Sequence, residues 1–217
     1  MQIAIAVYPD LTVLDVIGPY QVLTALPGAE VVLCAERPGR VSDDHGRLHL
    51  DVETSFADVP EPDVLLVGGG LGTRRLMHPG SAVVEWIRAA HPRTTWTTSV
   101  CTGSLLLGAA GVLDGLDATT HWNAVQLLES FGAAYVPERV VERGKVITGA
   151  GVSAGIDMAL TLVDRLQGPM VAQAIQLAIE YDPRPPFRAG SPATAPAEVT
   201  ELVRSVMDAA ENEVLGD

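Results

Sequence analysis

The stretch that decides the fold is Trp96-Thr97-Thr98-Ser99-Val100-Cys101-Thr102-Gly103-Ser104-Leu105. A β-prone run over residues 94–100 ends at Cys101, and a segment of helical character, residues 102–110, begins directly after it. A side chain at such a strand-to-helix corner projects from the end of the sheet. The free N–H groups of the following turn point towards it.

Cys101 is therefore a candidate nucleophile. The free N–H donors and the helix dipole favour an anion at the corner, so we expect the pKa of the Cys101 thiol to be lowered and its thiolate fraction raised. The alternative is a small buried apolar cysteine. Cys34, the second cysteine, lies inside a buried apolar run, residues 30–35, and is expected to be structural.

The bulk composition fits one globular domain over residues 1–217, because 47% of the 217 residues are apolar. A net charge of −13 without any run of Lys or Arg argues against nucleic-acid partners. No apolar stretch approaches the roughly 20 residues that span a bilayer. The N-terminus has no basic segment ahead of an apolar run. We therefore expect a cytoplasmic protein that does not associate with membranes.

Short apolar runs alternate with segments of helical periodicity. Residues 2–8, 30–35, 63–68 and 94–100 have the pattern of strands buried on both faces. Helical segments lie between them, at residues 11–26 and 81–91. This alternation predicts an α/β fold with a parallel sheet sandwiched between helices.

Two segments interrupt this alternation, and the later part of the chain is mainly helical. Residues 40–56 alternate apolar with polar around Asp44-His45-Gly46, which predicts an antiparallel excursion; residues 136–148 predict a second hairpin. Helices are expected at 121–131, 153–166, 169–181 and, as a terminal amphipathic helix, 198–214. The Pro-rich residues 182–197 are expected to be extended.

Open parallel sheets bind ligands at the carboxyl ends of their strands. Asp15 follows the first strand, within an otherwise apolar helical stretch. Burial would raise the pKa of its carboxyl into the useful acid–base range. The alternative is a carboxylate that complements a helix dipole.

A glycine-rich loop, Gly68-Gly69-Gly70-Leu71-Gly72, follows the strand at 63–68. Its spacing matches neither a dinucleotide fingerprint nor a P-loop. Beside a nucleophile, the backbone N–H groups of Gly69 and Gly70 are candidate oxyanion donors, as in acyl-transfer sites. A plain tight turn is equally compatible with the sequence.

The histidines give weaker signals. His121 can reach the cysteine only through the fold, and helix capping or packing explains it equally well. Thr102, not a histidine, follows Cys101, which argues against a protease. His45 and His49 share one strand face, but no carboxylate or cysteine joins them at ligand spacing, so no metal site is predicted.

Together these pieces resemble the DJ-1/PfpI superfamily of flavodoxin-like proteins from end to end, and within it most of all the isonitrile (isocyanide) hydratases. The matching segments are 15–19, 99–103, 119–122 and 151–157, and the tail at 176–187 is the most specific to that subgroup. Much of the first four segments is shared with sensor domains of AraC-type regulators. Those regulators carry a basic helix-turn-helix domain after this unit, whereas this sequence stops at Asp217 without one.

The resemblance implies hydration of an isonitrile to an N-substituted formamide by a hydro-lyase. It assigns the nucleophile to Cys101, the acid–base partner to Asp15 and a site-lining role to Thr102. Family loops often have Pro-Gly-Gly where this chain has Gly68-Gly69-Gly70. The resemblance also implies a homodimer, a small-molecule substrate, and no metal or organic cofactor. The alternatives are a glyoxalase- or deglycase-like enzyme and a non-enzymatic ligand or redox sensor.

Overall fold

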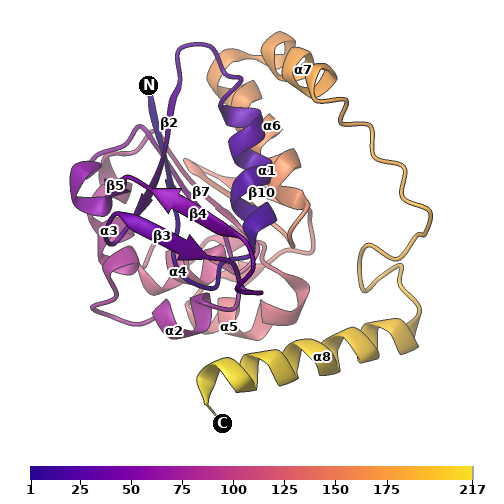
Figure 1. Cartoon of the computed structure of the whole chain (residues 1–217). Coiled ribbons are helices and arrows are strands. Elements are labelled where there is room, and N and C mark those ends of the chain that lie inside the picture. Colours follow the sequence, from indigo (N-terminus) through magenta and orange to yellow (C-terminus); the bar gives the residue numbers. More distant parts are fainter. Residues whose placement is uncertain (217) are drawn as a thin grey trace.

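The computed structural model describes residues 1–216, and a seven-stranded sheet forms its centre (Figure 1). The strand order is β10-β11-β7-β6-β1-β2-β5. Neighbouring strands are parallel except for β10 and β11 at one edge. Their bounds are Gln2–Ala6 (β1), Glu30–Ala35 (β2), Thr54–Ser55 (β5), Val64–Val67 (β6), Trp96–Val100 (β7), Val140–Arg143 (β10) and Val146–Gly149 (β11). The predicted α/β class is confirmed.

The central strands are continuous apolar runs because both of their faces are covered. Residues 3–6 of β1 and all of β6 are completely buried, and β6 pairs with β1 on one side and β7 on the other. A parallel strand covered on both faces has no polar face to show in its sequence. The apolar runs that predicted these strands are therefore the same residues that form the core.

Helices cover the sheet in two groups. Helix α1 (Val13–Leu23) packs against α6 (Ala154–Gln167), which in turn contacts α7 (Pro169–Ala178). Helix α4 (Gly103–Ala109) packs between α3 (Ala82–Ala90) and α5 (Val125–Ser130), and also contacts the short α2 (Thr73–Leu76). The predicted helices at 81–91, 153–166 and 169–181 are confirmed, with ends within a few residues.

Both antiparallel excursions are confirmed, with one difference. Strands β3 (Gly39–Ser42) and β4 (His49–Val52) form the first hairpin, and β10 with β11 forms the second. The end of the predicted 40–56 segment instead leaves the hairpin, and β5 pairs in parallel with β2 in the main sheet. A short pair, β8 (Asp117–Ala118) with β9 (Ala134–Tyr135), was not predicted.

Two predicted helices are shorter or broken in the structure. The segment predicted over 11–26 forms α1 only from Val13, because Leu11 makes a bridge with Asp43 and Thr12 has an extended backbone. The segment predicted over 121–131 is a 3₁₀ turn, Trp122–Ala124, followed by α5. In both places a tertiary contact or local turn overrides the apolar periodicity.

The C-terminal part is loosely attached to the body. Residues 182–196 form no helix or strand and are almost entirely exposed, as expected of a Pro-rich extended segment. They lead to α8 (Ala197–Leu215), which confirms the predicted terminal helix. In Figure 1 this segment arcs away from the body before α8 returns below α2 and α5. Over residues 1–216, no helix has both the length and the apolar character that crossing a bilayer requires.

Candidate active site

Three segments meet at the carboxyl edge of the sheet. They follow β1, β6 and β7, which are neighbours in the sheet, and they supply Asp15 from the start of α1, the glycine loop 68–70 and Cys101. Parallel strands bring their carboxyl ends to one edge, which explains why residues so far apart in sequence converge here. The structure thus brings together all the site residues that the sequence predicted.

Cys101 occupies a strained corner that its neighbours hold in place. Its φ is +57°, a left-handed conformation that non-glycine residues rarely adopt. Its N–H donates to the carbonyls of Gly149 (3.0 Å) and Ala150 (2.9 Å). Its own carbonyl accepts from the hydroxyls of Thr120 (3.1 Å) and Ser104 (3.0 Å). These bonds fix the backbone that carries the thiol, and Cys101 is 5% exposed.

Asp15 lies in the first turn of α1 and is completely buried. Its Oδ2 accepts a 2.7 Å hydrogen bond from the backbone N–H of Gly69. Its Oδ1 has no partner of hydrogen-bond geometry among residues 1–216. The carboxyl also interacts with the side chain of Cys101. A completely buried carboxyl beside a thiol is within reach of a proton exchange with the sulfur, and its acid–base role stays a prediction.

The glycine loop is close-packed against the other two loops. A Cβ on Gly69 would lie 2.5 Å from both the backbone nitrogen and Oγ1 of Thr102, and 2.9 Å from Oδ2 of Asp15. Real Cβ atoms do not approach neighbours this closely, so only glycine fits here without displacing the loop. The N–H of Gly69 donates to Asp15 and that of Gly70 to Oγ1 of Thr102 (3.0 Å). Both donors therefore orient side chains, and direct binding of an oxyanion by them stays a prediction.

Thr102 joins the elbow to this loop. Its Oγ1 accepts from the N–H of Gly70 and lies 3.3 Å from the carbonyl of Gly70, to which it donates. Its backbone N–H interacts with the sulfur of Cys101, as does that of Val152. Thr102 thus acts on the thiol through its backbone and on the loop through its side chain.

Burial changes the ionisation of both reactive groups. It raises the pKa of Asp15 to about 7, against the opposing effects of the Gly69 N–H and the Cys101 side chain. Burial also raises the pKa of the Cys101 thiol well above its ordinary value, and the charge of Asp15 raises it further. The expected lowering of the thiol pKa is therefore wrong. The N–H donors of the elbow do favour the thiolate, but desolvation and the neighbouring carboxylate outweigh them.

The thiol opens onto a small cavity of about 120 Å³. Residues from the elbow, the glycine loop, α2, the 121–124 turn and α8 line it together: Thr12, Asp44, Gly70, Leu71, Arg74, Cys101, Thr102, His121, Asn123, Ala124, Val152, Met207 and Glu211. Apolar atoms make up most of the exposed wall, although seven of the thirteen lining residues are polar or charged. Such a cavity admits a small molecule that is apolar apart from its reacting end.

His121 both lines this cavity and caps the following turn. Its Nδ1 accepts from the N–H of Asn123 at 3.3 Å. Burial and the charge of Arg74 lower the pKa of His121 to about 4, so the ring is neutral near pH 7. The two interpretations left open by the sequence are thus compatible, because one ring nitrogen caps the turn while the side chain borders the cavity.

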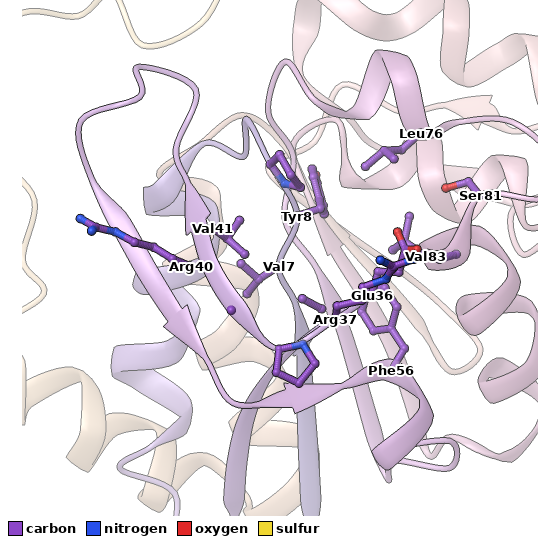
Figure 2. A pocket seen from close by; sticks show the side chains of 15 residues that line it. Val7, Tyr8, Glu36, Arg37, Arg40, Val41, Phe56, Leu76, Ser81 and Val83 are labelled. Atoms are coloured by element: carbon purple, nitrogen blue, oxygen red, sulfur yellow. Dashed lines mark ion pairs between the residues drawn. The ribbon is translucent and has the colours of Figure 1, made fainter.

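Two larger cavities lie nearby but lack both Cys101 and Asp15. One, of about 360 Å³, lies between the β3–β4 hairpin and α3 and is shown in Figure 2, with Tyr8, Val41 and Phe56 on its walls. The hydroxyl of Tyr8 donates to the carbonyl of Gly68, so this side chain links the cavity to the glycine loop. The other, of about 460 Å³, shares His121 and Val152 with the Cys101 cavity. Volume alone does not locate chemistry, so the candidate active site is the smaller cavity with the thiol.

Sequence reasoning missed several residues of this cavity. Asp44 was interpreted only as part of a hairpin turn, yet its Oδ2 accepts from the hydroxyl of Thr12 at 2.7 Å. Arg74 had no motif to mark it. Met207 and Glu211, both in α8, lie more than 100 residues beyond Cys101 in the sequence. No local sequence signal distinguishes any of the four.

The fold and the site together define a class of protein. It is an α/β protein with a parallel sheet, a strained cysteine at a strand-to-helix elbow and a buried acid against that cysteine. The chain belongs to the DJ-1/PfpI family, whose model matches residues 1–165. It is 45% identical over 204 residues to isonitrile hydratase from Pseudomonas putida, a match that covers 94% of this chain and 89% of that protein.

Two other comparisons show how much of the chain resembles other proteins. A crystal structure of a ThiJ/PfpI family protein from Pseudomonas syringae superposes with a TM-score of 0.92 at 38% identity, over 98% of this chain and 88% of that one. The HTH-type transcriptional regulator CdhR from Pseudomonas aeruginosa is 37% identical over 112 residues, which are 51% of this chain and 33% of the regulator. The likeness to the hydratase and to the P. syringae structure thus extends over nearly the whole chain.

Proposed function

We propose that this protein is an isonitrile hydratase, which adds water to an isonitrile and releases an N-substituted formamide. The contact between the buried Asp15 carboxyl and the Cys101 thiol carries the proposal, because it pairs a nucleophile that borders a small cavity with a buried proton carrier behind it. The 45% identity to the P. putida hydratase supports the choice of substrate class.

The reaction begins with addition of the Cys101 sulfur to the terminal carbon of the isonitrile. As the C–S bond forms, the thiol proton passes to Asp15, and Asp15 then delivers it to the same carbon. The product is a thioimidate, Cys–S–CH=N–R, and Asp15 is left as a carboxylate. A group with a pKa of about 7 suits both halves of this transfer near neutral pH.

Water completes the reaction at the same carbon. Asp15 takes one proton from the attacking water and passes it to the nitrogen, which gives a tetrahedral adduct bearing a hydroxyl and an N–H. The C–S bond then breaks, Asp15 carries the hydroxyl proton to the departing sulfur, and R–NH–CHO leaves. The net change is addition of one water, with thiol and carboxyl restored.

A product assay tests this proposal directly. Wild-type protein should convert an alkyl or an aryl isonitrile to its formamide, and Cys101→Ala should not. Methylglyoxal and hydrogen peroxide, tested in parallel, represent the glyoxalase-like and redox-sensor alternatives. The small exposure and raised pKa of the Cys101 thiol argue against rapid oxidation by peroxide. Lactate formation with a higher kcat/KM than formamide formation would overturn the proposal.

We also infer that the protein works as a homodimer in the cytoplasm. Helix α7 exposes Met170 (82%) and Leu177 (77%), a large apolar exposure for one short helix. Both cysteines are unpaired, which suits a reducing compartment. Light scattering at micromolar concentration should give twice the mass of the chain, and Leu177→Glu should shift it towards the monomer. A wild-type monomer would contradict the inference.

A further inference from the structure

Helix α8 borders the Cys101 cavity, although only an exposed segment without helix or strand connects it to the rest of the fold. The exposed segment 182–196 leads to it and arcs away from the body in Figure 1. A long exposed tether restrains the position of what it carries only weakly. The location of α8 is therefore set by the contacts of the helix itself.

Those contacts are mainly polar and lie on one stripe of the helix. Glu211 Oε1 accepts from Arg74 Nη2 at 2.5 Å, and Asp208 Oδ1 accepts from Asn123 Nδ2 at 3.1 Å. One turn earlier, the guanidinium of Arg204 lies 5.3 Å from the ring centre of Trp122. Positions 204, 208 and 211 fall on one face of a helix, so a single side of α8 is attached to the rim of the cavity. Elsewhere on the helix, Leu202 and Val206 are 65% and 61% exposed.

The Arg74–Glu211 pair is the strongest of these attachments. The Arg74 side chain is only 4% exposed and that of Glu211 21%, so water screens the pair much less than it screens a surface ion pair. Arg74 Nη1 is buried and has no hydrogen-bond partner among residues 1–216, so Glu211 is the carboxylate that balances this buried charge. Loss of Glu211 would leave the guanidinium buried and uncompensated.

Met207 and Glu211, one helical turn apart, form the α8 wall of the Cys101 cavity. With this wall in place the cavity holds about 120 Å³. For comparison, an engineered protein cavity of about 150 Å³ binds benzene. A bulky substituent on a molecule attached to Cys101 would therefore meet the α8 wall.

We propose that Met207 and Glu211 are specificity-determining residues, which restrict the Cys101 pocket to isonitriles with small substituents, and that Arg74 is the positioning residue that holds them there. The choice of isonitriles rests on the proposed function. The size restriction itself applies to any reagent that must reach the Cys101 sulfur. It can therefore be measured separately from turnover.

The first test uses alkylation of Cys101, followed by mass spectrometry of the peptide that contains it. Rates are measured with iodoacetamide, which is small, and with a bulky aromatic maleimide. Met207→Ala and Glu211→Gln should each raise the rate ratio of maleimide to iodoacetamide at least fivefold. The matched controls are Val206→Ala and Glu213→Gln, exposed residues of the same helix, which should leave the ratio unchanged. An unchanged ratio in both test variants, or an equal change in the controls, would overturn the proposal.

The second test repeats the comparison with isonitriles of increasing bulk. In Met207→Ala, kcat/KM for the bulkiest substrate should rise relative to the smallest by at least fivefold, chiefly through KM. Raising the salt concentration should change this ratio little in the wild type, because salt screens a mostly buried ion pair only weakly. If no isonitrile is turned over but alkylation shows the size effect, the proposed function fails while the role of α8 stands. If turnover occurs and neither assay shows a size effect, the role of α8 fails alone.

Discussion

The carboxylate of Asp15 raises the pKa of the Cys101 thiol, whereas the Cys101 side chain lowers the pKa of Asp15. The first proton to leave the buried pair therefore leaves from Asp15, at a pH of about 7. Between that pH and the higher pKa of the thiol, the pair holds one proton, which either group can carry. This one-proton state is the one that the proposed reaction needs.

The pH dependence of activity should follow the loss of that first proton. Below pH 7 the pair holds two protons, Asp15 cannot accept the thiol proton, and kcat/KM should fall about tenfold per pH unit. Above pH 7 kcat/KM should reach a plateau, because the number of protons on the pair no longer changes. Initial rates from pH 5 to 9 check this, and a flat profile from pH 5 to 7 would exclude this assignment.

Asp15→Asn should make the thiol more acidic while removing proton transfer. Without the carboxylate charge, the pH midpoint of Cys101 alkylation by iodoacetamide should move down, measured in a Cys34→Ala background. Isonitrile turnover should nevertheless fall by about 10² or more, the usual cost of losing general acid–base catalysis. Full turnover in Asp15→Asn would return the carboxyl to a helix-start role and make His121 the next candidate.

Gly69→Ala should disrupt the site without disrupting the sheet. The added Cβ meets Thr102 at 2.5 Å and Asp15 at 2.9 Å, so the glycine loop must move away from both. We expect kcat to drop at least 100-fold while the far-UV circular dichroism is retained. Gly190→Ala is the matched control, because a Cβ there has no neighbour within 4 Å. Equal activity of the two variants would contradict the close packing.

Replacing Cys101 should affect activity, whereas replacing Cys34 should affect stability. Cys101→Ala should abolish turnover and leave Tm within a few degrees, since the thiol is a small group at the edge of a cavity. Cys34→Ala should keep turnover and cost on the order of 1 kcal/mol, because Cys34 is fully buried in β2. Thermal melts and formamide assays on both variants provide the check. Turnover in Cys101→Ala at the wild-type rate would refute the nucleophile assignment.

The sheet, the elbow and the position of Asp15 could be predicted because each leaves a local pattern. Buried parallel strands are continuous apolar runs, and Cys101 stands where one such run changes to helical periodicity. A lone carboxylate in an apolar helix is also visible in sequence. The hairpin ends and the start of α1 were less accurate, because Leu11–Asp43 and β2–β5 pairings depend on tertiary contacts.

The rest of the site could not be predicted, since distant segments form it. Arg74 and Glu211 are 137 residues apart, and nothing near either residue predicts the other. The ionisation of Cys101 was predicted with the wrong sign for a related reason. The elbow donors are local and visible, but the burial of the sulfur and the approach of Asp15 exist only in the folded chain.

The left-handed backbone of Cys101 implies a compromise between activity and robustness. At φ = +57° any residue with a Cβ is disfavoured by roughly 1 kcal/mol, and glycine is not. Cys101→Gly should therefore be inactive but unfold at a higher denaturant concentration than Cys101→Ala does. The wild-type sequence keeps at this corner a residue that its own backbone disfavours, which is what the proposed need for a thiol there predicts.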